Sequence, residues 1–355
     1  MMTKMRKFAV LTKARNAEVH KGKIPEVGDN QVLIKQEACN ICTTDFGQWL
    51  GLREHQPYPM AGGHEGAGII VAKGKNVRDG LNIGDHVALA YDYCGECTAC
   101  QTGRTSECIE ISNPFKDKND EGYYGHLGFA TYNVKNANTV IKMNPKLSFS
   151  EAGFLEPLAT VVSGLKRLRV TALERVVVIG AGTMGILNAL AATAYGAEVI
   201  VTEMMDKKIE AARSMGLNVI DVKKYDPVEK VKELTNAEGA DAVILAVGVT
   251  KANDQALEMV KHLNGRLLLF AAGYPAPELN VDSNLVHYRK IELIGTYGAD
   301  IHDFNKSANL LNDAKVDVSK LIETKVPIEE IQKAYEIAST QGSYRVSVLL
   351  QEESE

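Results

Sequence analysis

The chain of 355 residues has no apolar run as long as the roughly 18 residues that a membrane-spanning helix needs. No apolar stretch follows the basic N-terminal residues MMTKMRKF, so a secretory signal peptide is not expected. Neither sign of charge dominates: 40 basic and 45 acidic residues leave a net charge of −5, which gives no reason to expect a nucleic-acid partner. We therefore expect a cytoplasmic protein that binds neither membrane nor nucleic acid.

Low-complexity segments and internal repeats are also absent from the sequence, which argues against disordered and repeat architectures. Hydrophobic residues make up 45% of the chain and charged residues 24%, a composition typical of a globular protein. A chain of this length usually divides into two domains of ordinary size.

Cysteine is scarce, but four of the six cysteines fall in one short run: Cys94, Cys97, Cys100 and Cys108. Four thiolates at this spacing can surround one tetrahedral zinc ion in a closed, structural site. A bacterial iron–sulfur motif has its fourth cysteine after three residues and then proline, whereas here seven residues intervene and Ile109 follows. Disulfides belong to oxidising compartments and small secreted chains. The run therefore favours structural zinc over a cluster or disulfides.

The first 145 or so residues have the short, punctuated apolar runs of β-strands. Candidate strands lie at residues 31–38, 66–72 and 85–90, separated by glycines and polar turns. Ser148 and Glu151 then resemble a capping box, and apolar residues at helical spacing follow them.

From about residue 175 strand and helix patterns alternate. Apolar strands are predicted at 176–179, 199–202, 242–247, 266–270 and 291–295, with helices at 183–195, 207–215 and 252–263. Such alternation predicts a parallel sheet covered on both faces. After a helical stretch from about residue 301, an apolar strand at 345–350 could return to the first domain and make it discontinuous.

A glycine-rich turn after the first of these strands consists of Gly180, Gly182, Thr183, Met184 and Gly185. Its glycines permit a tight turn, close approach of a pyrophosphate and close helix packing, and the helix N-terminus attracts phosphates. Glu203 ends the next strand, where a carboxylate accepts hydrogen bonds from a ribose 2′-hydroxyl and repels a 2′-phosphate. The sequence therefore predicts an NAD site rather than an NADP site, although Lys207 and Lys208 lie close by. The alternative is a glycine turn with no ligand.

Four further residues carry metal-ligating groups: Cys42, His64, Glu65 and Glu156. Catalytic zinc takes about three protein ligands and leaves a position for water or substrate, and thiolate, imidazole and carboxylate groups suit it. Taken one at a time, each residue has an ordinary alternative as a buried small cysteine, a loop histidine or a solvated carboxylate. A second, open metal site is a hypothesis that rests on the four residues acting together.

As a set, the motifs resemble those of the zinc-containing medium-chain alcohol and polyol dehydrogenases. The resemblance runs from Lys7 to Leu350 and is carried by residues 42–45 (CTTD), 63–68 (GHEGAG), 128–132 (GFATY) and 156–158 (EPL), with the four-cysteine run and the glycine-rich turn. The glutamate of the EPL segment resembles the sorbitol and threonine dehydrogenase branch.

The resemblance implies an α/β protein with two domains. A GroES-like, mostly-β catalytic domain would comprise residues 1–158 and 300–355, with a structural zinc lobe at about 92–110. A Rossmann domain with a doubly wound parallel sheet would comprise residues 159–299 and bind NAD. Two zinc ions per subunit, one catalytic and one structural, are implied. So is a homo-oligomer, either a tetramer or a dimer, since the strand at 291–295 could pair between subunits.

The resemblance also implies the ligands of the catalytic zinc. Cys42 and His64 would bind it directly. Glu65 would be the third ligand or would exchange with water. Glu156 would lie against the zinc or its bound water.

Two more roles follow from the resemblance. Asp45 would orient the ligating histidine, and Thr44 would hydrogen-bond to the alcohol and take its proton. The zinc would lower the pKa of the substrate hydroxyl, and the carbon that bears it would pass a hydride to the nicotinamide. The product would be a ketone or an aldehyde.

Three positions depart from the family pattern. The family commonly has a histidine five residues after its catalytic cysteine, as the outer end of a proton relay, whereas this chain has Gly47. Water or another group such as His55 would then complete the relay. Thr43 stands where glycine is usual, and Cys39 is an extra thiol for which we expect a packing role.

The motifs say least about the substrate. Glu156 together with a structural zinc lobe favours a secondary alcohol in a polyol or sugar alcohol resembling sorbitol, iditol or inositol. L-Threonine 3-dehydrogenase and butanediol dehydrogenase activities are alternatives, as is an NAD redox sensor without turnover, while the cysteines disfavour a zinc-free reductase of the same fold. Aromatic residues that could line the pocket or simply pack in the core are Trp49, Tyr123, Tyr124, Phe129 and Tyr297.

Overall fold

The computed structural model describes residues 5–53, 56–110 and 117–352, and the chain forms two compact units. The first comprises Met1–Glu156, Asp300–Asn312 and Leu321–Glu355, and the second comprises Pro157–Ala299 and Asp313–Lys320. Residues 313–320 thus group with the second unit, although the sequence analysis assigned them to the first. One reason is that Lys320 Nζ donates to the carbonyl oxygen of Ser214 at 2.7 Å. No helix in the described ranges is long and apolar enough to cross a bilayer.

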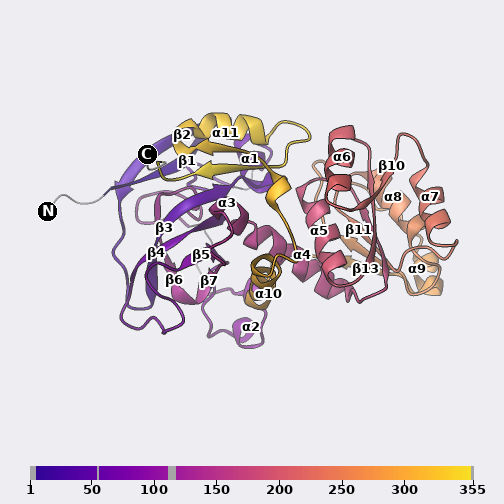
Figure 1. Ribbon diagram of the computed structural model, residues 1–355, viewed down its shortest axis with the longest axis horizontal. Helices are drawn as coiled ribbons and strands as arrows, with labels where there is room; N and C mark the ends of the chain where they lie inside the picture. The colour runs from indigo at the N-terminus through magenta and orange to yellow at the C-terminus, as the bar shows by residue number, and fades with distance from the viewer. Residues whose placement is uncertain (1–4, 54–55, 111–116, 353–355) are drawn as a thin grey trace. The chain divides into compact units, whose positions relative to one another are not determined.

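β-Structure dominates the first unit (Figure 1). Its main sheet contains, in spatial order, β14 (Ile322–Pro327), β15 (Arg345–Leu349), β3 (Gln31–Asn40), β4 (Glu65–Lys73), β5 (His86–Leu89) and β7 (Val140–Lys142), with β6 (Tyr132–Asn136) also paired to β3. A separate antiparallel pair is formed by β1 (Met5–Lys13) and β2 (Asn16–Lys23). The helices of this unit are α1 (Thr43–Trp49), α2 (Thr98–Gln101), α3 (Phe149–Ala152), α10 (Ile301–Asn312) and α11 (Ile331–Ala338).

The C-terminal strand β15 makes the first unit discontinuous in sequence. It pairs antiparallel with β3, so that Val348 lies opposite Cys39. The strand predicted at 345–350 therefore does return to the first unit. The pairing of these two strands buries the side chains of Val346, Val348 and Cys39 completely.

Aromatic side chains fill the core beside α1. Trp49 stacks on Tyr335 with ring centroids 6.1 Å apart, and Phe129 meets the same ring edge-on at 6.1 Å. Trp49 and Phe129 are 4% and 1% exposed, so both residues pack in the core and do not line a pocket. Tyr297 is 98% exposed in the second unit, which fits neither of the two alternatives, a pocket wall or core packing.

The second unit is a six-stranded parallel sheet with the order β10 (Asn218–Asp221), β9 (Glu198–Glu203), β8 (Arg175–Ile179), β11 (Ala242–Leu245), β12 (Arg266–Leu269) and β13 (Glu292–Gly295). Its helices are α4 (Leu155–Leu168), which begins in the first unit, α5 (Thr183–Ala194), α6 (Asp206–Ser214), α7 (Pro227–Leu234), α8 (Thr250–Met259) and α9 (Ser283–Arg289). The strand order reverses direction at β8, which is the doubly wound Rossmann arrangement. The predicted strands are confirmed, while β10 was missed because its four residues carry too short an apolar signal.

The glycine-rich turn joins β8 to α5 as predicted. Gly180 has φ +101°, a backbone conformation that residues other than glycine rarely adopt. A Cβ atom on Gly185 would overlap the carbonyl oxygen of Gly180, so the helix can pack this closely on the strand only with glycine there. Gly182 caps α5 in an open position, where the nearest atom to a Cβ would be Lys208 Nζ at 3.7 Å.

This difference predicts unequal effects of alanine within one motif. Gly185→Ala should lower the free energy of unfolding by about 1–3 kcal/mol because the added methyl group overpacks the turn, and thermal or denaturant melting would measure it. Gly182→Ala is the matched control and should melt within about 0.5 kcal/mol of the parent. Equal melting of the two variants would contradict the close packing described for Gly185.

Candidate active site and metal centres

Cys42 sits at the N-terminus of α1, directly after β3 ends. Its backbone N–H donates to Asp45 Oδ2 at 3.0 Å, which is half of a capping box that starts the helix. The thiol is therefore held at a fixed place between a strand and a helix, both of which are well packed.

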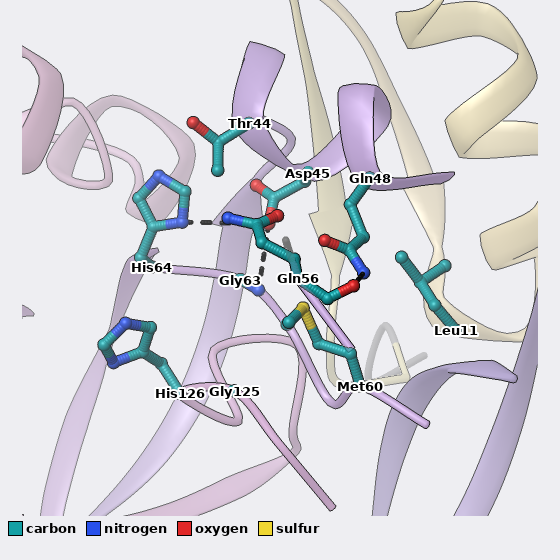
Figure 2. Close-up of a pocket in the computed structure, with 11 residues that line it drawn as sticks. Leu11, Thr44, Asp45, Gln48, Gln56, Met60, Gly63, His64, Gly125 and His126 are labelled. Atoms are coloured by element: carbon teal, nitrogen blue, oxygen red, sulfur yellow. Dashed lines mark hydrogen bonds and ion pairs between the residues drawn. The ribbon is translucent and has the colours of Figure 1, made fainter. Parts of the chain in front are cut away.

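Asp45 fixes the second candidate ligand as well. Its Oδ1 accepts a hydrogen bond from the backbone N–H of Gly63 at 3.1 Å and lies 3.7 Å from Nδ1 of His64 (Figure 2). The side chain is only 6% exposed. One buried carboxylate thus ties α1 to the loop that enters β4 and lies against the imidazole, as an orienting role for Asp45 requires.

Cys42, His64 and Glu65 bring their ligand atoms together. One sulfur, one imidazole nitrogen and one carboxylate oxygen lie within 4.8 Å of one another. This donor set suits zinc, and three protein ligands leave a coordination position open. The residues present therefore fit a catalytic zinc ion.

Arg345, which the sequence analysis missed, completes the surroundings of Glu65. Its Nε and Nη2 donate to the two carboxylate oxygens at 2.9 and 2.7 Å, and Nη2 lies 3.6 Å from Cys42 Sγ. The arginine and the glutamate side chains are 4% and 0% exposed. Arg345 reaches the site only because β15 pairs beside β3, so no local sequence motif could have identified it.

Glu156 is held differently from Glu65. Its Oε1 accepts a hydrogen bond from the hydroxyl of Tyr91, whose ring packs edge-on against Phe304 at 5.0 Å. The carboxylate is 5% exposed, and it is not part of the group of three whose donor atoms converge. The two carboxylates predicted for the zinc site are thus engaged by separate partners, Arg345 and Tyr91.

The charges around Cys42 favour its thiolate. Burial by itself raises the pKa of Cys42, but the Arg345 guanidinium and the His64 imidazole outweigh burial and lower the pKa to about 6. Burial lowers the pKa of His64, yet Asp45 and Cys42 outweigh it and raise that pKa well above its usual value. Without metal the site therefore stores a proton on His64, and a zinc ion has to displace that proton in order to bind.

Thr44 and His64 line one cavity in the first unit (Figure 2). Gln48 and Gln56 also line it, and their Oε1 atoms are buried without a hydrogen-bond partner among the described residues. The histidine predicted as one possible replacement for the relay, His55, lies outside the described residues. At Gly47 itself, the space next to the α-carbon is taken by the side chain of Arg53.

The four-cysteine run forms a second and closed group. The sulfur atoms of Cys94, Cys97, Cys100 and Cys108 all lie within 4.8 Å of one another, with Cys97 and Cys100 3.5 Å apart. All four are free thiols, and backbone N–H groups of Glu96 and Cys97 donate to Cys94 Sγ at 3.4 and 3.3 Å. Four sulfur donors with amide hydrogen bonds to one of them fit a structural zinc ion.

In the second unit, Glu203 ends β9 beside the glycine-rich turn. Its carboxylate accepts hydrogen bonds from the backbone N–H groups of Ala181, Met204 and Met205 at 2.8, 2.6 and 2.9 Å. Glu203 therefore also braces the turn, a role that the sequence analysis did not foresee. Lys208 Nζ lies close to Gly182, which brings one cation to the loop expected to hold phosphates.

Comparisons with known proteins agree with this geometry. Residues 28–145 match the alcohol dehydrogenase GroES-like domain, and residues 183–313 match the zinc-binding dehydrogenase domain. L-Galactonate-5-dehydrogenase of Escherichia coli is 30% identical over 88% of this chain and 89% of its own length. L-Threonine 3-dehydrogenase of Shewanella oneidensis is 30% identical over 91% and 93%. The crystal structure of a zinc-binding dehydrogenase from Sinorhizobium meliloti bound to NADP has a TM-score of 0.85 and 25% identity, and the match covers 98% of this chain and 99% of that one.

The two domain models between them cover more than half of the chain, and the relatives match over most of their length. The predicted GroES-like and Rossmann folds are confirmed. The chain therefore belongs to the zinc-binding alcohol dehydrogenases, oxidoreductases that act on CH–OH groups with zinc and a nicotinamide dinucleotide.

Proposed function

We propose that this enzyme oxidises a secondary hydroxyl group of a polyol or sugar-derived alcohol to a ketone with NAD as the acceptor. The observation that carries the proposal is the open group of Cys42, His64 and Glu65, with Glu156 close enough to influence the pKa of His64. A carboxylate-rich site suits a substrate with several hydroxyl groups, each of which can donate a hydrogen bond. One relative carries a name that places oxidation at carbon 5 of a sugar acid, which is a secondary alcohol.

Each residue has a part in this reaction. A zinc ion in the open site supplies Lewis-acid polarisation that lowers the pKa of the alcohol, and NAD supplies the hydride acceptor. Cys42 and His64 would hold the metal, with Glu65 as a third donor that is also paired with Arg345, and Asp45 fixes the imidazole. Thr44 takes the proton of the alcohol.

Three alternatives are L-threonine oxidation, butanediol oxidation and an NAD redox sensor, and only the first rests on specific observations. L-Threonine oxidation is favoured by the relative from Shewanella oneidensis and disfavoured by Gly47, where a relay histidine is usual in this family. Butanediol oxidation uses the same site. An NAD redox sensor would keep both metal groups and show no turnover.

We also propose a homo-oligomer, a tetramer or a dimer, that works in the cytoplasm. Strand β13 forms one edge of the parallel sheet and is open to pairing. The six thiols, all of them in the described part of the chain and all unpaired, suit a reducing compartment.

The function is tested by following NADH absorbance with zinc-loaded protein and a panel of sorbitol, inositol, L-galactonate, L-threonine, butanediol and simple alcohols. Cys42→Ser should lower kcat/KM by at least about a thousandfold, since the metal contribution is worth several kcal/mol, without changing the melting temperature. Cys100→Ser is the matched control in the closed site, and it should lose one zinc per subunit and melt about 5 °C or more lower. Full activity of Cys42→Ser would refute the assignment of the catalytic zinc.

The charge balance of the open site predicts a pH dependence. In metal-free protein the Cys42 pKa of about 6 means that the thiolate persists above pH 6 and is lost as the pH falls through that value. Alkylation of Cys42 by iodoacetamide, followed by peptide mass spectrometry, should therefore show a midpoint near pH 6. Arg345→Gln should move the midpoint upward, toward the ordinary thiol value, because the nearest cation is gone. An unchanged midpoint would mean that Arg345 does not stabilise the thiolate.

Glu203 should set the choice between NAD and NADP. Glu203→Ala removes the negative charge at the end of β9 and should raise kcat/KM with NADP relative to NAD by about tenfold or more. The variant should also melt lower, because three backbone N–H groups lose their acceptor. Glu198→Ala, at the exposed start of the same strand, should change neither property. An unchanged cofactor ratio in Glu203→Ala would place the ribose contact elsewhere.

A further inference from the structure

Two glutamine side chains of the first unit carry buried hydrogen-bond acceptors that no group in the described part of the chain satisfies. The Oε1 atoms of Gln48 and Gln56 have no hydrogen-bond partner, and the two residues are only 1% and 5% exposed. Buried acceptors without a donor destabilise a folded protein and are rare in native structures. Both atoms are therefore suited to a donor that enters from outside the protein.

Both glutamines face the site described above. They line the same cavity as Thr44 and His64, and Figure 2 shows the amide of Gln56 between His64 and the amide of Gln48. The cavity has a volume of about 10 Å³, which is room for roughly one water-sized group. A group that fills the cavity therefore lies beside both Gln56 and the candidate metal ligand His64.

Hydrogen bonds hold the backbone of Gln56 in place and leave its amide oxygen free. The N–H of Gln56 donates to the carbonyl oxygen of Arg53 at 3.0 Å, and its carbonyl oxygen accepts from Gln48 Nε2 at 2.8 Å. Gln48 is itself fixed by the hydroxyl of Tyr58, which donates to its carbonyl oxygen at 2.6 Å. Gln56 is thus tied to the end of α1 before any ligand arrives, as a binding residue requires.

The lining of the cavity selects the kind of group that fits. Leu11 and Met60 contribute buried apolar side chains, and Asp45 contributes a buried carboxylate. A carboxylate repels an anion, and an amide oxygen accepts a hydrogen bond but donates none. A hydroxyl group on a carbon meets these conditions, because the O–H donates one proton and the carbon packs against the apolar side chains.

We propose that Gln56 is a specificity-determining residue whose Oε1 accepts a hydrogen bond from a second hydroxyl group of the substrate, on the carbon next to the one oxidised. This inference rests on the proposed function, in which the metal held by His64 binds the reacting hydroxyl. The second hydroxyl has to be close to the first, since the cavity borders His64 and has room for one group. The substrate class is thereby narrowed to vicinal diols, polyols among them, over alcohols with a single hydroxyl group.

The test compares 2,3-butanediol with 2-butanol, which lacks one of the two hydroxyl groups. The parent should have the higher kcat/KM with the diol. Gln56→Leu has no acceptor at a similar volume, so the ratio of kcat/KM for the diol over 2-butanol should fall about 3- to 10-fold, the range for one lost hydrogen bond. Gln36→Leu is the matched control and should leave the ratio unchanged, because Gln36 Oε1 is also buried without a partner but Gln36 does not line the cavity.

Thermal melting separates recognition of the substrate from a structural role. Gln56→Leu should melt no lower than the parent, because the oxygen that it loses makes no hydrogen bond within the described chain. Lower melting with the diol and 2-butanol affected alike would mean that the cavity holds only an ordered water, and the proposal would be overturned. A parent that prefers 2-butanol or L-threonine to the diol would overturn it as well.

A binding measurement keeps this proposal separate from the proposed reaction. Titration calorimetry with zinc-loaded protein gives the Kd of 2,3-butanediol without turnover, and this Kd should rise in Gln56→Leu by the same factor as the ratio falls. If the parent oxidises no alcohol yet binds the diol through Gln56, the proposed reaction fails while the hydroxyl site stands. An unchanged Kd in Gln56→Leu would show that Gln56 does not bind the second hydroxyl.

Discussion

The buried pairing of Arg345 with Glu65 is the interaction on which the active-site unit depends. It joins the last strand of the chain to the strand that follows His64, through two hydrogen bonds of 2.9 and 2.7 Å with almost no solvent exposure. A buried ion pair contributes little net stability, but removal of one partner costs about 3–5 kcal/mol because the other charge is left unpaired. The guanidinium also lies 3.6 Å from Cys42 Sγ and stabilises the thiolate that a metal ion needs.

The two groups of metal-ligating residues are built by different means. The four cysteines come from one short stretch of chain, so local spacing alone brings their sulfur atoms together. The open group comes from the end of β3 and the start of β4, and it needs Asp45 to join them. This difference has a physical reason: a structural site only has to close a loop, whereas a catalytic site has to hold ligands rigidly and leave one position open.

A glycine in helix α1 decides which side chain packs against that part of the helix. Gly47 has no side chain, so the helix has no imidazole at that position. The side chain of Arg53, from the turn that follows the helix, occupies the space instead. The cavity beside His64 is also lined by Gln48 and Gln56, whose buried Oε1 atoms have no hydrogen-bond partner among the described residues.

Short-range patterns of apolar residues, glycines and cysteines predicted the parallel sheet with its helices, the glycine-rich turn and the closed cysteine group, whereas the GroES-like fold followed from the resemblance to a family. It also identified Cys42, Asp45, His64 and Glu65, but only as a set that resembles a family. Tertiary structure alone decided that Arg345 holds Glu65, that Tyr91 holds Glu156, that Glu203 braces the glycine-rich turn and that Arg53 fills the space at Gly47. The first two contacts join residues 280 and 65 positions apart in the chain, and no local pattern records which distant side chains a sheet brings together.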